Sequence, residues 1–234
     1  AKRYVESQEG NRMKLTALLE RLQYEVVQGT KEIEITELTN DSRKVTEGSV
    51  FVCISGAVSD GHQYIEEVGK KGAAAVIVEK DVEAPKHMTV IRVEDTRYAL
   101  ALASAAYFGY PAEQLKVIGI TGTKGKTTTT YMVKAILEEV GHKVGLIGTI
   151  EAIIGDKTIP SNNTTPESYT IQKYFAQMVE AGCDCVVMEV SSQGLMLHRT
   201  AGIMFDIGIF TNLGEDHIGP NEHKDFEDYK RCKG

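Results

Sequence analysis

A glycine-rich stretch between an apolar strand and an amphipathic helix constrains this chain more than any other part of its sequence. The run KVIGIT (116–121) predicts a buried strand, and TTTYMVKAILEEV (128–140) predicts a helix that ends at Gly141. Glycines in the connecting loop let the backbone approach a ligand closely and point N–H groups at phosphate oxygens. The new helix adds the positive end of its dipole. The arrangement therefore predicts a nucleotide phosphate site.

The residue types at the end of this loop fit that chemistry. Lys126 would reach the terminal phosphates, and the Thr127 hydroxyl would ligate Mg²⁺. The common pattern G-x-x-x-x-G-K-[ST] is not met, because Ile120 stands where it requires glycine, so the loop is the shorter form G-x-x-G-K-T. Such a short pattern also arises by chance in glycine-rich connections. The strand-loop-helix context and the threonine run 127–130, which suits a helix start, favour nucleotide binding.

Strand patterns alternate with helical patterns along the rest of the chain, which predicts an α/β fold. We expect a small N-terminal α/β domain, followed by a P-loop ATPase domain with a mostly parallel sheet. The seam is predicted near Pro111, which gives an extension over 1–12, a first domain over 13–111 and a second over 112–234. The predicted elements of the first domain are a helix from Met13, the strands IEITEL, SVFVCIS, AAAVIVE and MTVIRVE, and helices after Asp60 and Thr96. The second adds the strands KVGLIGTI, CDCVVMEV and FDIGIF and the helix PESYTIQKYFAQMVEAG.

Composition excludes several classes of protein. Of 234 residues, 42% are hydrophobic and 25% charged, which is enough apolar material for a core. The 26 Lys and Arg against 33 Asp and Glu give a net charge of −7, so a broad basic surface for nucleic acid is not expected. No apolar run approaches a membrane span, and residues 1–12 contain no apolar signal core. The four cysteines lack zinc-pair spacing and predict free thiols in a reducing cytoplasm.

Polar residues follow two further apolar strands. Glu189 ends CVVMEV, and Asp216 and His217 follow FDIGIFTNL. Ligands of parallel α/β sheets gather at the carboxyl ends of the strands, where the phosphate loop also lies. Alone, Glu189 could cap the next helix and His217 could be an ordinary surface histidine. Together with the loop they predict a metal site at this edge of the sheet.

Several ordered blocks resemble the Mur ligase family of peptidoglycan synthesis. TGTKGKTTT is similar to its ATP loop, and MEVSSQGLMLHR and TNLGEDH to its next two blocks; DSRKVTEGSVFVCISGAVSDGHQYI and MKLTALL resemble its N-terminal part. NTTPES (163–168), MEVSS and Arg199 are most similar to the branch that adds the third amino acid, meso-diaminopimelate or L-lysine, to UDP-MurNAc-L-Ala-D-Glu. The resemblance implies an ATP-dependent amide ligase that works through an acyl phosphate. It also implies a monomer, and an N-terminal fragment that lacks the amino-acid-binding C-terminal domain and is inactive alone.

The resemblance assigns roles to individual residues. The positions that match substrate contacts are Ser42, Asn163, Thr164, Thr165, Ser191 and Arg199. Those that match the ATP loop are Thr121, Gly122, Thr123, Lys124, Gly125, Lys126 and Thr127. The metal positions are Thr127, Glu189, His217 and Lys233, and catalysis is implied for Lys126, Glu189, His217 and Lys233. A family lysine four residues after a tyrosine is carbamylated and helps to place Mg²⁺, which Tyr229 and Lys233 fit.

The chain departs from the family pattern at two points. Leu197 stands where many members have Gln, so one substrate hydrogen bond is expected to be absent or replaced. IGPNEHKDFED (218–228) is longer than the common form and leaves Lys230 as a competing assignment for the modified lysine. Two other functions stay open. One is a related ligase of the folylpolyglutamate or cyanophycin synthetase type, and the other is a nucleotide-binding module without catalysis.

Overall fold

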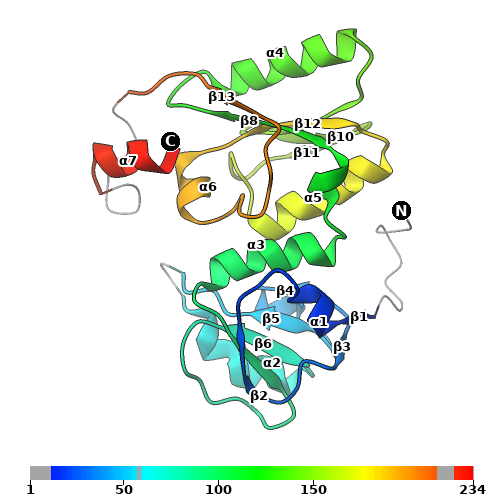
Figure 1. The fold of residues 1–234 in the computed structure, drawn as a ribbon, viewed down its shortest axis with the longest axis vertical. Coiled ribbons are helices and arrows are strands. Elements are labelled where there is room, and N and C mark those ends of the chain that lie inside the picture. The colour runs from blue at the N-terminus through cyan, green and yellow to red at the C-terminus, as the bar shows by residue number, and fades with distance from the viewer. Residues whose placement is uncertain (1–11, 57–58, 215–223, 234) are drawn as a thin grey trace. The chain divides into compact units, whose positions relative to one another are not determined.

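The computed structural model describes residues 12–56, 59–214 and 224–233, and it divides them into two compact units between Tyr107 and Phe108 (Figure 1). Both units are α/β with mostly parallel sheets, as the sequence predicts. The structural boundary falls shortly before the predicted seam at Pro111. The roles assigned to the two domains remain predictions, and the extension lies outside the described residues except for Arg12.

The first unit is built on a five-stranded sheet in the order β2-β7-β6-β5-β4, parallel except for the edge pair β2–β7. Its strands are β1 (Met13–Lys14), β2 (Glu25–Gln28), β3 (Glu34–Ile35), β4 (Leu38–Thr39), β5 (Val50–Val52), β6 (Ala75–Val78) and β7 (Thr89–Arg92). Its helices are α1 (Leu15–Leu18), α2 (Ile65–Lys70) and α3 (Thr96–Tyr107), with short 3-10 turns at Ser42–Lys44 and Gly61–Tyr64. Ile65 and Val68 of α2 pack on Phe51, Val76 and Val90 of the sheet.

The helix predicted from Met13 is shorter than expected. Met13 and Lys14 pair instead with β3 as a two-residue antiparallel ladder, and the Leu15 N–H donates to Ile33 O. The helix that follows covers a single turn and still buries Leu15 and Leu18. The apolar spacing therefore predicted the buried face correctly, but backbone pairing with β3 claims the first two residues.

The second unit is built on a six-stranded sheet in the order β11-β10-β9-β12-β8-β13. Its strands are β8 (Lys116–Thr121), β9 (Val144–Ile147), β10 (Glu151–Ile154), β11 (Lys157–Pro160), β12 (Cys185–Glu189) and β13 (Ile207–Phe210). Its helices are α4 (Lys126–Glu139), α5 (Ser168–Glu180), α6 (Ser192–Met196) and α7 (Phe226–Lys233), with a 3-10 turn at Pro111–Gln114. The strands β9, β12, β8 and β13 are parallel. Their carboxyl ends therefore share one edge of the sheet.

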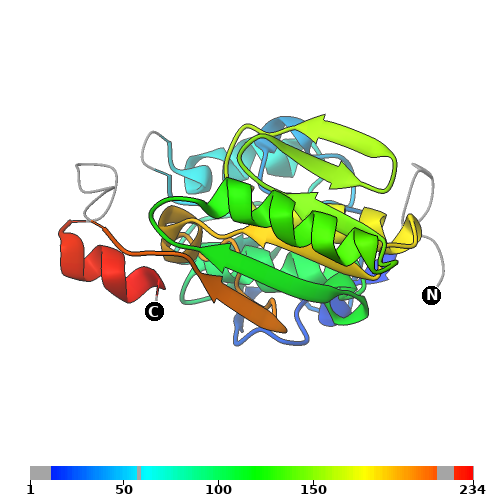
Figure 2. The same ribbon diagram turned by 90° about the horizontal axis from the view of Figure 1, so that it is seen from above.

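Helices cover both faces of this sheet, because successive side chains of a strand point to opposite faces (Figures 1 and 2). Ile118, Ile120 and Val187 pack with Val133 and Leu137 of α4. The alternate positions of the same strands face α5, in a cluster made of Val117, Val186, Met188, Ile171, Phe175 and Met178 with their neighbours. Both layers hold β8 and β12 rigidly, and these two strands lead into the phosphate loop and Glu189.

Two features of this sheet were not predicted. The segment 151–160 forms an antiparallel hairpin, β10–β11, that turns at Gly155 with φ +56°. Strand β13 is an edge strand of the described sheet, and its Ile207 and Phe210 are about half exposed although their sequence reads as a core strand. None of the described helices is both long and apolar enough to cross a membrane.

Candidate active site

The glycine-rich loop joins the end of β8 to the start of α4, as predicted. Gly122 has φ +138°, a backbone conformation that is essentially restricted to glycine, and a Cβ there would lie 2.0 Å from Thr211 Oγ1. Gly125 has φ +83° and precedes the first residue of α4. The loop therefore needs its two glycines for different reasons, the first for close packing and the second for the turn into the helix.

A segment after β13 braces this loop. The N–H groups of Thr123 and Lys124 donate to Asn212 O and Asn212 Oδ1, both at 2.9 Å. The Thr211 hydroxyl donates to Lys124 O at 2.8 Å, and the Asn212 side-chain amide donates to the same carbonyl at 2.9 Å. Two of the loop amides that the sequence offers to phosphate are thus bonded to protein. The N–H groups of the first turn of α4, which lack acceptors within a helix, are better placed donors.

Lys126 is half-buried at the first position of α4. Its ammonium donates to Gly122 O at 2.8 Å and to Thr123 O at 3.2 Å, so it folds back over the loop. These carbonyls hold the charge in place beside the helix start. A negatively charged ligand there would compete with them for the ammonium.

The Glu189 carboxylate is buried, with 1% of its surface exposed, at the carboxyl end of β12. Its Oε2 accepts hydrogen bonds from the Thr127 and Thr149 hydroxyls, each at 3.0 Å, and its Oε1 accepts from the Thr149 N–H at 2.9 Å. Gly148 permits this approach, because a Cβ there would lie 2.5 Å from Oε1. The structure thus joins Thr127 and Glu189, which the sequence placed on the same edge.

The loop Asn163–Thr165 is fastened to the same strand end. The buried Thr165 hydroxyl donates to Glu189 O at 3.0 Å and accepts from Ser191 N at 2.9 Å. Ser191 caps α6 by accepting from Gly194 N at 3.0 Å. The Thr164 hydroxyl lies 3.0 Å from that of Thr149, whereas Asn163 is exposed.

Arg199 stabilises the loop Asn163–Thr165 through hydrogen bonds. Its guanidinium donates to Thr165 O at 3.0 Å and to Glu167 Oε1 at 2.6 Å, and its side chain is only 10% exposed. Its Nε is buried and has no hydrogen-bond partner among the described residues. Arg199 therefore orders the loop in this structure, and a role in holding a substrate carboxylate remains a prediction.

The remaining predicted site residues, Ser42, His217 and Lys233, have no described contact with this strand end. Ser42 belongs to the first unit, where it is half-buried and its carbonyl accepts from Lys71 Nζ at 2.8 Å. His217 lies outside the described residues, as does the side chain of Lys233 at the end of α7. Tyr229, four positions before Lys233, is fully buried with its hydroxyl 2.9 Å from Thr123 Oγ1. Lys230 is exposed and pairs with Glu227.

Tyr131 of α4 contacts the hairpin β10–β11. Its hydroxyl donates to Glu151 Oε1 at 2.7 Å. Burial, followed by this hydrogen bond and the charges of Glu151 and Glu189, raises the pKa of Tyr131 to about 12. The phenol therefore stays neutral and acts as a hydrogen-bond donor.

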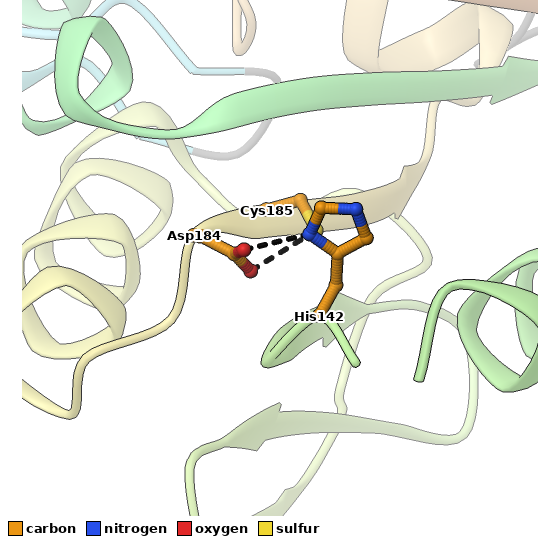
Figure 3. Close-up of side chains that lie close together, drawn as sticks. All are labelled: His142, Asp184 and Cys185. Carbon is orange, nitrogen blue, oxygen red and sulfur yellow. Dashed lines mark hydrogen bonds and ion pairs between the residues drawn. The ribbon is translucent and has the colours of Figure 1, made fainter. Parts of the chain in front are cut away.

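A second cluster, of His142, Asp184 and Cys185, lies at the opposite edge of the sheet where β9 and β12 begin (Figure 3). His142 Nδ1 lies 2.7 Å from Asp184 Oδ2 and lowers the pKa of that carboxyl, while the Cys185 thiol donates to Asp184 Oδ1 at 3.4 Å. Burial, with Asp184 next, raises the pKa of Cys185 to about 12. We interpret the cluster as a hydrogen-bonded network that ties the starts of two strands together.

Comparison with known proteins agrees with this geometry. The profile of the Mur ligase middle domain matches residues 120–234, and the profile described as Mur ligase family, catalytic domain, matches residues 34–110. The chain belongs to the Mur ligase family. The UDP-N-acetylmuramoyl-L-alanyl-D-glutamate--2,6-diaminopimelate ligases of Clostridium perfringens (strain 13) and Bacillus licheniformis are 48% and 46% identical to it. Each match takes in 94% of this chain but 45% of the relative, so the chain spans under half the length of these Mur ligases.

Solved structures show the same Mur ligase fold. A structure titled UDP-N-acetylmuramoyl-L-alanyl-D-glutamate--2,6-diaminopimelate ligase superposes with a TM-score of 0.78 at 22% identity, over 94% of this chain and 44% of that one. MurF from Acinetobacter baumannii gives a TM-score of 0.62 at 22% identity, over 95% of this chain and 45% of that one. These likenesses confirm the α/β fold of this Mur ligase chain.

Sequence reasoning missed several residues that build the site. Thr149 follows Gly148 at the end of β9, on the same edge as Glu189, so the rule that found Glu189 could have found it. Asn212 follows β13 in the same way. Tyr131 and Glu151 carried no such signal, because their contact joins a helix to a hairpin that was not predicted.

Proposed function

We propose that the chain carries the nucleotide- and substrate-binding parts of a MurE-type ligase, which joins meso-diaminopimelate or L-lysine to UDP-MurNAc-L-Ala-D-Glu at the expense of ATP. The observation that carries the proposal is the 3.0 Å hydrogen bond between Thr127 of the phosphate loop and the buried Glu189 carboxylate. It brings the loop and a metal-binding group together at one strand end. The names of the relatives, which specify 2,6-diaminopimelate, favour diaminopimelate over L-lysine as the amino acid.

The reaction needs ATP because a carboxylate is a poor electrophile. Transfer of the terminal phosphoryl group to the D-glutamate carboxylate gives an acyl phosphate and ADP, and the incoming amine displaces phosphate to form the amide. The first step brings the triphosphate and a carboxylate together, and in the second negative charge develops on the carbonyl oxygen and the departing phosphate, so the protein must offset negative charge. Lys126 and the first turn of α4 would bind the phosphates, and Thr123 and Lys124 would shape the loop through Asn212.

The donor set fits Mg²⁺. The Thr127 and Thr149 hydroxyls each lie within hydrogen-bond distance of the Glu189 carboxylate, and Mg²⁺ prefers such hard oxygen ligands. Thr127 and Glu189 would hold the ion, with His217 as a further residue implied by the family. When bound, Mg²⁺ would offset phosphate charge. The protein's own part is to keep Glu189 buried and oriented before any ligand arrives.

Lys233 is our proposal for the carbamylated lysine. Tyr229 fastens α7 to the phosphate loop through Thr123, and position 233 follows one helical turn later. Lys230 is exposed and already paired with Glu227, which argues against it. A carbamate would convert an ammonium into an oxygen ligand. Incubation with ¹³C-labelled bicarbonate should give a carbamate signal that Lys233→Ala removes and Lys230→Ala keeps; the reverse would reassign the lysine.

The test of the nucleotide site is binding, because the chain spans under half of its relatives. Calorimetry with Mg²⁺-ATP should show binding that Lys126→Ala weakens, since its ammonium is the cation nearest the loop carbonyls. Lys157→Ala removes the same charge from an exposed position on the hairpin and is the matched control. Equal affinities for all three proteins would refute the nucleotide site.

The substrate is tested separately. UDP-MurNAc-L-Ala-D-Glu should bind and shift the NMR signals of the segment around Ser42, whereas folate should not. Binding of folate in its place would favour a folylpolyglutamate-type ligase. Binding of ATP with neither substrate would favour a nucleotide-binding module. An ATP-consuming step on a UDP-linked precursor also places the proposed reaction in the cytoplasm.

A further inference from the structure

We propose that Thr149 is the positioning residue of this site, which orients the Glu189 carboxylate for a divalent cation and couples it to the substrate loop through Thr164. The inference rests on the proposed function and deepens it. It concerns a residue to which neither the motifs nor the family resemblance assigned a role.

The contacts of Thr149 are concentrated on one carboxylate. Its N–H donates to Glu189 Oε1 at 2.9 Å and its hydroxyl donates to Glu189 Oε2 at 3.0 Å, so one residue holds both oxygens. Two anchors on one residue fix the rotation of the carboxylate plane. Thr127, the third donor, contacts Oε2 at 3.0 Å and so cannot fix this rotation alone.

Proton counting gives the hydroxyl contacts a direction. A threonine hydroxyl has one proton, and that of Thr149 is donated to Glu189 Oε2. Its 3.0 Å contact with Thr164 therefore requires Thr164 to donate and Thr149 to accept. The result is a directed chain from the Thr164 hydroxyl to the Thr149 hydroxyl to the Glu189 carboxylate.

This chain joins two parts of the proposed site. Thr164 lies in the loop that resembles the substrate-binding loop of the family, and its neighbour Thr165 is bonded to the Glu189 backbone. A movement of that loop would alter the donor that polarises Thr149. The cation site and the substrate loop should therefore be energetically coupled.

A simple structural role does not account for Thr149. The residue is exposed, whereas Glu189 is buried, so the Thr149 side chain contributes little to the core. Gly148 brings the backbone close enough for the Thr149 N–H to reach Oε1, and that bond survives any change of the side chain. Thr149→Val should therefore fold normally and lose the hydroxyl contacts alone.

The experiment compares ATP binding with excess Mg²⁺ and with EDTA, by calorimetry on the 234-residue chain. Thr149→Val should weaken binding about tenfold with Mg²⁺ and leave metal-free binding unchanged, because a hydrogen bond to a charged group has been lost. Thr149→Ser retains the hydroxyl and should stay within about twofold of the wild type. In a cycle with Thr164→Val, the double variant should lose less affinity than the two single variants together.

The outcomes separate the two proposals. An equal loss with Mg²⁺ and with EDTA, or no loss at all, would overturn the role of Thr149 and leave the proposed function in place. Strict additivity with Thr164→Val would overturn the coupling. If the wild type itself shows no Mg²⁺-dependent ATP binding, the proposed function fails and this inference fails with it.

Discussion

Replacing Gly122 by alanine tests whether packing against the segment after β13 sets the shape of the phosphate loop. The backbone at Gly122 has φ +138°, where an L-residue is strained by about 1–3 kcal/mol. The new Cβ would also lie 2.0 Å from Thr211 Oγ1 and 3.0 Å from Asn212 O. Thr211 would have to move away from Lys124 O and Thr121 O, which share its one hydroxyl proton in a hydrogen bond worth about 0.5–1.5 kcal/mol.

The expected loss of stability is therefore about 1.5–4.5 kcal/mol when the strain and the broken hydrogen bond are added. Gly125→Ala is the matched control. Gly125 has φ +83°, but no atom of the described residues lies within 4 Å of the point where the alanine methyl group would stand, so only the left-handed strain of about 1–2 kcal/mol applies. Each variant replaces one glycine of the same loop, and the difference between their stabilities reports mainly on packing against Thr211 and Asn212.

Urea unfolding followed by far-UV circular dichroism gives the free energy of unfolding of both variants. The second unit contains the loop, so its transition should move while that of the first unit stays fixed. A Gly122→Ala protein as stable as Gly125→Ala would show that the contact with Thr211 is relieved without cost. It would also refute the view that the residues after β13 determine the shape of the phosphate loop.

Three further predictions concern groups outside the loop. Hydrogen bonds from Lys80 and then His62 hold the pKa of Asp60 below its usual range, so Asp60→Asn should lower the free energy of unfolding at neutral pH. The difference from the wild type should shrink below about pH 4, where the unfolded carboxyl is protonated. A difference in stability that persists in acid would contradict this. Folding raises the pKa of Tyr131 to about 12, so the stability that its protonated phenol contributes is lost as the pH rises from about 10. In an alkaline absorbance titration, Tyr131→Phe should therefore remove a phenol that ionises at about pH 12. Loss of a phenol that ionises near pH 10 would contradict this. Phe175→Ala should cost about 3–5 kcal/mol of urea stability, since Phe175 is fully buried between α5 and the sheet, and a loss under about 1 kcal/mol would show that the core refills.

The parallel sheet could be predicted because its strands are buried on both faces. The runs that became β8 and β12 are almost continuously apolar, a pattern that few other structures explain. Strand β10 alternates half-buried and buried positions over four residues, and its hairpin with β11 turns at Gly155-Asp156. Its glycine-containing two-residue turn was a usable signal. The exposure of β13 was beyond prediction, because it depends on which strands lie beside it and not on its own sequence.

The residues of the candidate site likewise divide into those that the sequence could predict and those that it could not. Glu189 and Thr127 were found because strand ends and helix starts lie at positions that the sequence reveals. The roles of Thr149 and Asn212 depend on distances across the sheet between segments that are remote in the chain. Threonine and asparagine are also common at strand ends for reasons of turn formation, so their presence there carries little information. Geometry, rather than residue type, distinguishes them.

The segment after β13 braces the short glycine-rich loop of this member of the Mur ligase family. The loop uses the N–H groups of Thr123 and Lys124 to bond Asn212, 88 positions after Lys124. Because those N–H groups are bonded to Asn212, they hold the shape of the loop and are not available to donate to a phosphate. Under the proposed function, the start of α4 and Lys126 would then bind the phosphates, and Thr127, the next residue, would bind the metal ion. The end of β13 therefore supplies part of the framework that holds this loop.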